Sequence, residues 1–221
     1  MKITHLGHSA VLVEVAGTRI LIDPGNFSDA WHGLTGLDAV VVTHLHPDHV
    51  DPDHAPALIN ANPDARVLVE PGVPDAVDLP RSDRLPSGTS QTVGAVTIEA
   101  VGGQHAVIHR DIPLIGNVGV LIKAEGEPTL FHPGDSLAAC PEGVDVLALP
   151  AMGPWAAMKE HIDFTRQIGA PMGFPIHDGL INERGWGLVT SRIEAMSDTQ
   201  LSDLRDGQAR EVTPTGFSDV P

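Results

Sequence analysis

Short runs rich in Val, Ile and Leu recur along the chain, and Gly, Pro and Asp separate them. Apolar runs of this length, bounded by turn-forming residues, are typical of β-strands. We predict strands at Lys2–Leu6, Ala10–Val15, Arg19–Asp23, Ala39–Thr43, Arg66–Glu70, Val93–Val101, Val118–Ala124, Thr129–His132, Val144–Leu149 and Pro171–Ile176. The first three lie close together with glycines in the turns between them, which predicts antiparallel hairpins.

Helical patterns are fewer, and strands precede them in the chain. We predict helices at Pro52–Asn60, Pro74–Val77, Ala156–Ile168 and Val189–Ser197. Strands followed by strand–loop–helix units favour a layered α/β domain. The sequence shows no internal repeat, low-complexity tract or linker, so we expect one domain over residues 1–221. Its polar tail from Gly207 onward is expected to pack loosely.

The composition of the chain limits which binding partners and which cellular compartment we expect. The chain has 13 Lys and Arg against 29 Asp and Glu, a formal net charge of −16. Because such an acidic surface repels phosphate backbones and anionic membranes, we expect neither nucleic acid nor a membrane as a partner. The single cysteine, Cys140, excludes an intramolecular disulfide framework. Glu14 and Arg19 interrupt the apolar stretch near the N-terminus, which is unlike a signal peptide. These features together predict a cytoplasmic protein.

The strongest chemical signal is the segment at residues 43–49, which reads Thr-His-Leu-His-Pro-Asp-His and follows a predicted strand. In extended backbone, His44 and His46 point the same way because side chains alternate between the two faces. The proline after His46 breaks the strand, so Asp48 and His49 can turn toward the same space. Three imidazoles and a carboxylate suit a borderline divalent ion such as zinc.

The segment offers some of the ligands for each of two metal ions. In binuclear sites such ions lie about 3.5–4 Å apart. A second ion needs further ligands from elsewhere in the chain. The candidates are His105, Asp135 and His177. Each follows an apolar run, where open α/β sheets place their functional loops.

Residues 43–49, with the later His, Asp and His in that order, resemble the metallo-β-lactamase superfamily. Within it, the chain most resembles the L-ascorbate-6-phosphate lactonase-like metal-dependent hydrolases. Three further segments support the resemblance, which covers nearly the full length: Leu6–Ala10 (LGHSA), Leu21–Pro24 (LIDP) and Met152–Trp155 (MGPW). The resemblance implies a four-layer αββα sandwich with metals at the edge between the two sheets.

The resemblance also implies a ligand set of two divalent ions, zinc first and manganese as the alternative. It assigns the first ion to His44, His46 and His105, the second to Asp48, His49 and His177, and a bridging position to Asp135. Asp48 would also orient the attacking water. In one departure, Val-Asp-Pro follows the motif where glyoxalase-type members have two glycines. This difference disfavours the interpretation of the chain as a thioesterase. The chain also lacks room for the inserted domain of nucleic-acid-cleaving members.

Five further residues are candidates for supporting a ligand or contacting substrate: His8, Asp23, His109, Trp155 and Lys159. His8 either lines the site or closes a turn, and Asp23 either supports a ligand or caps a strand. Trp155 and Lys159 could form an apolar wall and an anion contact, although core packing and a solvated helix face explain them as well.

The function implied is metal-assisted hydrolysis, in which a metal-bridged hydroxide cleaves an ester-type bond in a small molecule, a lactone or a phosphodiester. An anionic substrate is among the candidates, and the metals would then do much of the anion binding because no Lys or Arg cluster is evident. Two alternatives remain at this stage. One is a di-iron site that reduces oxygen or nitric oxide, and the other is a non-catalytic binding protein that metal stabilises.

Overall fold

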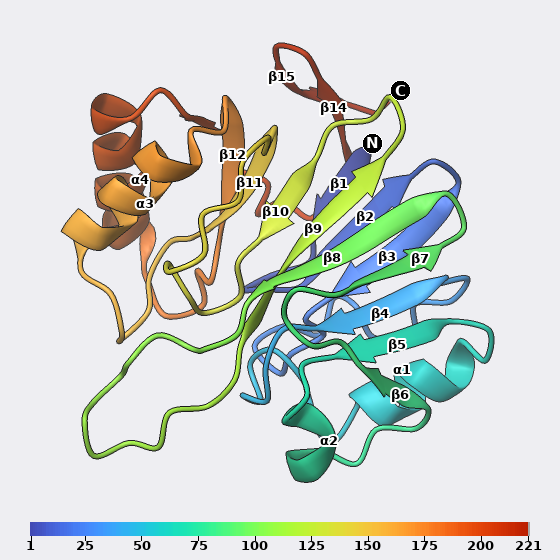
Figure 1. Ribbon diagram of the computed structural model, residues 1–221. Coiled ribbons are helices and arrows are strands. Elements are labelled where there is room, and N and C mark those ends of the chain that lie inside the picture. Colours follow the sequence, from blue (N-terminus) through green and yellow to red (C-terminus); the bar gives the residue numbers. More distant parts are fainter. Residues whose placement is uncertain (221) are drawn as a thin grey trace.

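The computed structural model describes residues 1–220, in which two mixed β-sheets pack face to face with helices on both outer faces (Figure 1). The first sheet has eight strands and the second has seven. This arrangement is the αββα sandwich, so the predicted fold class is confirmed.

The first sheet contains both ends of the described chain. Its strands, in spatial order, are β15 (Gly216–Asp219), β14 (Arg210–Thr213), β1 (Lys2–His5), β2 (Val11–Val15), β3 (Thr18–Ile22), β4 (Ala39–Val42), β5 (Arg66–Val69) and β6 (Ser82–Arg84). β1, β2 and β3 pair as antiparallel hairpins, as predicted, and β3 to β6 pair in parallel.

The second sheet is antiparallel at one end and parallel at the other. Its spatial order is β13 (Gln200–Leu201), β12 (Met172–Ile176), β11 (Val146–Pro150), β10 (Leu130–His132), β9 (Val118–Ala124), β8 (Val96–Gly102) and β7 (Ser90–Val93). Strands β7 to β10 alternate in direction, whereas β10 to β13 run in parallel.

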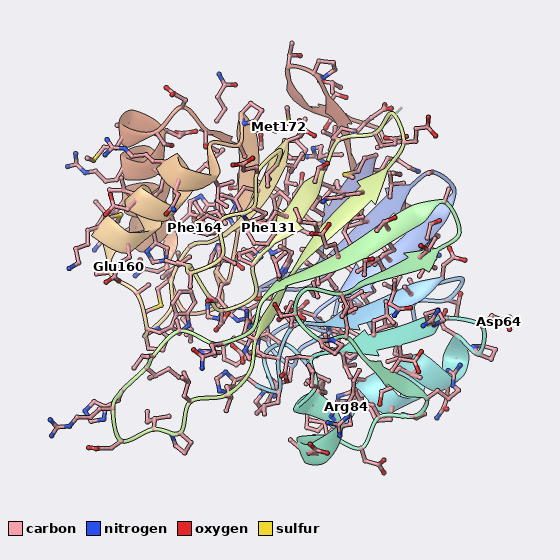
Figure 2. The ribbon with its side chains drawn as sticks, viewed as in Figure 1. Asp64, Arg84, Phe131, Glu160, Phe164 and Met172 are labelled. Atoms are coloured by element: carbon pink, nitrogen blue, oxygen red, sulfur yellow. The ribbon has the colours of Figure 1, made fainter. Side chains whose placement is uncertain are left out.

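Three apolar layers separate the sheets and helices. The central layer lies between the sheets and draws Ile20 from the first and Phe174 from the second. α3 (Met158–Ile168) and α4 (Glu183–Met196) cover the second sheet, where Phe164 packs in one cluster with Phe131 (Figure 2). α1 (Ala55–Ala61) and α2 (Val73–Ala76) cover the first sheet. Among residues 1–220, none of these helices has the length and apolarity needed to cross a bilayer.

Two expectations about strands are wrong. The predicted strand Val93–Val101 is a hairpin of β7 and β8, because Gly94 adopts a φ of +57° and turns the chain between the paired residues Val93 and Val96. The tail is not loosely packed, since β14 pairs with both β1 and β15. Its polar composition reflects an edge hairpin with one strongly buried side chain, Val212.

Helix α4 begins earlier than predicted, at Glu183 rather than Val189. Two glycines in its first half conceal the helical pattern in the sequence. The side chain of Asn182 caps the helix by accepting hydrogen bonds from the backbone N–H groups of Arg184 and Gly185, both at 3.1 Å. This cap satisfies donors that the first turn of a helix otherwise leaves without partners.

Strand direction decides where the site forms. β1, β3 and β4 run the same way in the first sheet, as do β8, β10 and β12 in the second. The segments that follow these strands carry the candidate site residues: His8, Asp23, 43–49, His105, Asp135 and His177. The fold therefore collects them at one edge of the sandwich.

A close backbone approach holds the 43–49 segment in place. The N–H of Asn26 donates to the carbonyl of Pro47 at 2.8 Å, and the N–H of Asp51 donates to that of Pro24 at 2.9 Å. Between them stands Gly25, where an added Cβ would lie 1.8 Å from the carbonyl oxygen of Asp48. Only glycine fits at this position without moving the backbone.

We expect Gly25→Ala to lower the free energy of unfolding by about 1–3 kcal/mol, because the added methyl forces the two segments apart. Chemical denaturation measures the change. Gly187→Ala on α4 is the matched control, since its Cβ would meet nothing within 4 Å. That substitution should raise stability by up to about 1 kcal/mol through helix propensity. Similar losses in both variants would contradict the close-approach explanation.

Candidate metal centre

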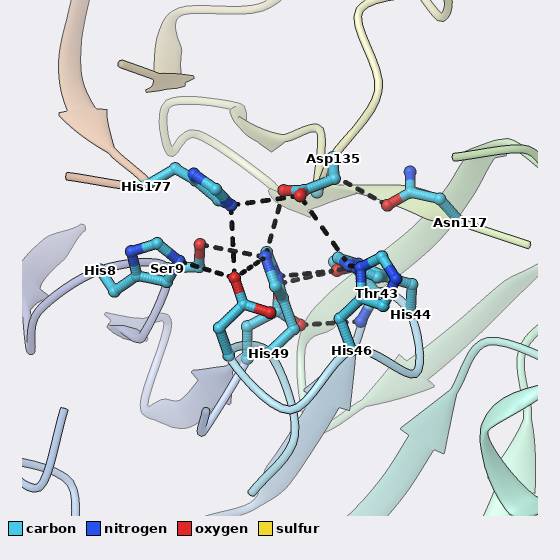
Figure 3. Close-up of polar contacts among 12 residues, drawn as sticks. His8, Ser9, Thr43, His44, His46, His49, Asn117, Asp135 and His177 are labelled. Carbon is cyan, nitrogen blue, oxygen red and sulfur yellow. Dashed lines mark hydrogen bonds and ion pairs between the residues drawn. The ribbon is translucent and has the colours of Figure 1, made fainter. Parts of the chain in front are cut away.

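Two groups of four His and Asp side chains meet at the shared edge of the sheets (Figure 3). Within each group, the candidate ligand atoms all lie within 4.8 Å of one another. The first group is His44, His46, His105 and Asp135, and the second is His8, Asp48, His49 and His177. The structure thus brings together every residue that the sequence predicted as a ligand.

Asp135 lies between the two groups (Figure 3). Its Oδ1 is 3.1 Å from Nε2 of His49, and its Oδ2 is 3.1 Å from Nε2 of His177. The same Oδ2 lies 3.4 Å from Nε2 of His105 in the first group. Asp135 therefore occupies the position that a bridging carboxylate requires.

Hydrogen bonds outside the centre fix how the imidazoles face it. Nδ1 of His105 donates to the carbonyl of Ala106 at 2.6 Å, and Nδ1 of His177 donates to the carbonyl of Met152. In the same way, Nδ1 of His49 donates to Oδ2 of Asp23 at 2.7 Å. In all three rings the Nε2 atom is left to face the centre. Such outer partners are the usual means of orienting a metal-binding histidine.

Several atoms that face the centre have no partner. Within residues 1–220, Nε2 of His105, Nε2 of His177 and Oδ1 of Asp135 are buried without a hydrogen bond. Buried polar atoms left unpaired are costly, and three that converge on one space call for a cation. Nε2 of His44 and Nδ1 of His46 also face each other at 3.1 Å. Nitrogen and carboxylate donors in this arrangement fit divalent metal ions; the number and identity of the ions stay predictions.

Burial and charge divide the histidines into two kinds. Burial lowers the pKa of His44 and of His46, so both rings are neutral, the form that binds metal. Burial also acts to lower the pKa of His49 and His177, but Asp135 and neighbouring carboxylates outweigh it. The pKa of His49 is therefore raised well above its usual value, and that of His177 is raised to about 9.

His8 holds Asp48 in place. The N–H of Gly179 donates to Nδ1 of His8 at 3.1 Å, so the ring proton lies on Nε2 and is donated to Oδ2 of Asp48 at 3.0 Å. In this tautomer the ring has no free lone pair for a metal ion. The ring also lies against His177 and Phe27, with centroid distances of 4.1 and 4.7 Å. The geometry assigns His8 a positioning role rather than that of a ligand.

The other candidates from the sequence lie at different distances from the centre. Asp23 is fully buried and also accepts hydrogen bonds from the N–H and Oγ1 of Thr43, so it supports His49. Nε1 of Trp155 donates to Oδ2 of Asp135 at 3.0 Å. His109 lies on the exposed loop between β8 and β9, and Lys159 is exposed in the first turn of α3. Their roles toward substrate stay predictions.

Sequence reasoning missed some members of this environment. Oδ1 of Asn117 accepts a hydrogen bond from the N–H of Asp135 at 2.9 Å, and no motif in the sequence marks this asparagine. A separate surface group of His32, Asp51 and His54 also has ligand atoms within 4.8 Å of one another. Its members come from two loops, so only the fold reveals their proximity.

A sandwich of this kind with two such groups at its edge defines the class of metal-dependent hydrolases with the metallo-β-lactamase fold. The model of the Beta-lactamase superfamily domain matches residues 2–177, and the chain belongs to this superfamily. Protein Rv0786c of Mycobacterium tuberculosis is 38% identical over 211 residues, which are 95% of this chain and 99% of that protein.

Two further similarities agree with this assignment. A UPF0173 metal-dependent hydrolase of Azorhizobium caulinodans is 29% identical over 155 residues, 62% of this chain and 64% of that protein. The crystal structure of YhfI, a metallo-β-lactamase fold protein of Bacillus subtilis, superposes with a TM-score of 0.72 at 16% identity, covering 94% of this chain and 98% of that one. The predicted superfamily and the predicted enzyme class, a hydrolase, are confirmed. The narrower resemblance to ascorbate-6-phosphate lactonases stays a prediction.

We expect His46→Ala to lose at least one bound metal ion per chain, because the remaining donors of its group no longer enclose the ion. Metal analysis after dialysis against zinc measures the content, and circular dichroism should show an intact fold since His46 is half-buried in a loop. His109→Ala is the control, because this exposed histidine belongs to none of the groups whose ligand atoms lie close together. Equal metal content in His46→Ala and the unmodified protein would contradict the assignment.

Metal binding should release protons at pH 7. Without metal, His177 with its pKa of about 9 carries a proton at this pH. Since only a neutral imidazole binds metal, zinc must displace that proton and the one on His49, whose pKa is also raised, so affinity should rise with pH from 7 to about 9. Calorimetry in two buffers of different ionisation enthalpy measures the number released. A value near zero at pH 7 would show that His177 is not a ligand.

Proposed function

We propose that this hydrolase cleaves an ester-type bond, that of a lactone or a phosphodiester, in a small-molecule substrate at a centre of two divalent ions. The observation that carries the proposal is the pair of ligand groups joined through one buried carboxylate, Asp135. The ions would be held by His44, His46 and His105 on one side, by Asp48, His49 and His177 on the other, and by Asp135 between them. Zinc is the first choice and manganese the alternative.

When bound, two divalent cations supply the Lewis acidity that activates water at neutral pH and stabilises negative charge developing on a substrate oxygen. The chain's own contribution is to fix the donors. Asp23 and the carbonyls behind His105 and His177 orient the rings, while Trp155 holds the carboxylate of Asp135. Such preorganisation matters because donors that are already in place need not reorient during the reaction.

Asp48 is the residue best placed to orient the attacking water. Its side chain is 19% exposed, against 4% for Asp135, so water and substrate can reach it. Burial acts to raise the pKa of Asp48, but the imidazole of His177, with Nε2 3.5 Å from Oδ2, and the hydrogen bond from His8 outweigh it and hold the pKa far below its usual value. The carboxylate is therefore ionised at neutral pH. It can orient a water molecule by accepting a hydrogen bond from it, although so low a pKa makes it a poor proton acceptor.

The kind of partner follows from charge. With a net charge of −16, the chain as a whole disfavours nucleic acid and anionic membranes, which supports a small molecule as the substrate.

A substrate panel tests the proposal. The zinc- and manganese-loaded protein should hydrolyse γ-lactones or bis(4-nitrophenyl) phosphate faster than it hydrolyses acetylthiocholine or a chromogenic β-lactam. Asp48→Asn should lower kcat on the preferred substrate about 100-fold, since the amide neither binds metal nor orients water as the carboxylate does, and misplaced reacting groups cost about that much.

Asp64→Asn serves as the control, because this exposed carboxylate lies after α1 on the outer face of the first sheet (Figure 2). Its kcat should equal that of the unmodified protein. Turnover confined to the thioester or the β-lactam, or full activity in Asp48→Asn, would refute the proposal.

A further inference from the structure

The loop between β8 and β9, residues 103–117, projects away from both sheets beside the metal centre (Figure 1). Its base is fixed. The N–H of Gly103 donates to the carbonyl of Asn117 at 2.9 Å, and the N–H of His105 donates to that of Ile115 at 3.1 Å. The N–H of Ala106 donates to the backbone carbonyl of Asp135 at 2.8 Å, which ties the loop to the backbone of that residue. The position of this 103–117 loop relative to the ligands is therefore set by the centre itself.

The exposed side chains of the loop are unusually apolar. Val107, Ile112 and Leu114 are 63%, 48% and 50% exposed. They make up three of the eight large apolar side chains that are exposed within residues 1–220. Single exposed apolar residues are ordinary on a soluble protein, whereas a group of them beside a site marks a binding surface.

Two hollows open beside His105, one on each side of Val107. The loop hollow, about 430 Å³, reaches the first ligand group at His46 and His105. Its apolar lining comes from Val107, Ile108, Ile112, Pro113, Leu114 and Ile115. The tryptophan hollow, about 360 Å³, lies between Val107 and Trp155 and also reaches His105. Because Val107 lines both hollows, a substrate tail that leaves the centre through either of them contacts Val107.

The charges around these hollows do not suit an anionic tail. Neither hollow has a lysine among its lining residues. The arginine of the loop hollow, Arg110, lies at the tip with its side chain 87% exposed, and Asp111 faces it at 3.7 Å. Glu160 lines the tryptophan hollow and would repel a negative group. Apolar contact is what these surfaces offer.

We infer that the 103–117 loop is a substrate-binding subsite for an uncharged hydrocarbon chain, the alkyl or acyl part of the ester whose hydrolysis is proposed above. This inference rests on that proposed function and narrows it. It specifies a substrate with a neutral apolar tail, where the sequence had left an anionic substrate among the candidates. Val107 and Leu114 are the residues that contact the tail. The free energy of binding comes from removing apolar surface from water.

Hydroxamates test the subsite without turnover, since the head group chelates metal and the tail varies. Calorimetry on the zinc-loaded protein should show octanohydroxamate binding about 60-fold more tightly than acetohydroxamate. This ratio corresponds to roughly twofold for each of six half-buried methylenes. The double variant Val107→Asp/Leu114→Asp should lower the ratio below about fivefold and leave acetohydroxamate binding unchanged, which also reports an intact centre.

Leu188→Asp is the matched control. Leu188 lies on α4, and its exposed fraction of 54% is similar to the 50% of Leu114. It lines neither hollow. The control should keep the full ratio. Equal affinity of the two hydroxamates, or an equal loss in the control, would overturn the subsite and leave the proposed hydrolysis standing. Failure of both compounds to bind would overturn the metal centre and the subsite with it.

Light scattering after size exclusion tests whether a second copy of the chain, rather than substrate, binds to the loop. The molar mass of the unmodified protein and of the Val107→Asp/Leu114→Asp variant should be the same if the loop binds substrate. A mass that falls in the double variant and not in Leu188→Asp would show that the loop is an interface between copies, and would overturn the inference.

Discussion

The buried carboxylate of Asp135 is the contact on which the rest of the centre depends. It faces His49 and His177 on one side and His105 on the other, so it couples the two ligand groups across the gap between the sheets. Its backbone N–H donates a hydrogen bond to the side chain of Asn117, the residue directly before β9. A Cβ on the preceding Gly134 would lie 2.3 Å from Oδ1 of Asn117, so the glycine is what permits this approach.

Charge in this molecule is arranged unevenly. The chain as a whole carries −16, yet the centre gathers imidazoles around two ionised carboxylates. Positive charge toward a substrate oxygen would come from bound cations, because the chain places no lysine beside the hollows. The 103–117 loop adds apolar area to this arrangement. In the proposed function, chemistry and substrate recognition are thus supplied by different elements that meet at His105.

The sequence was sufficient to pick out most of the side chains that meet in the centre because the signals are local. His44 and His46 alternate in extended backbone, and His105, Asp135 and His177 each follow an apolar strand. It was not sufficient for the tail, where an edge hairpin resembles a loose polar segment, or for the start of α4, where Gly185 and Gly187 conceal the helix. These are places where pairing and capping outweigh residue propensity.

By its residue types and order, the sequence alone predicted an α/β domain with two sets of potential metal ligands, and its resemblance to the metallo-β-lactamase superfamily implied hydrolysis. Only the tertiary structure decided which atoms face which. The tautomer of His8, for example, depends on Gly179, which is 171 residues away in the chain. The fold also places the apolar loop that follows His105 at the same edge as residues 43–49, through the direction of the strands. Nothing in the sequence indicated this proximity. The physical reason is that strand order and hydrogen bonds join segments distant in sequence, and no local pattern encodes that proximity.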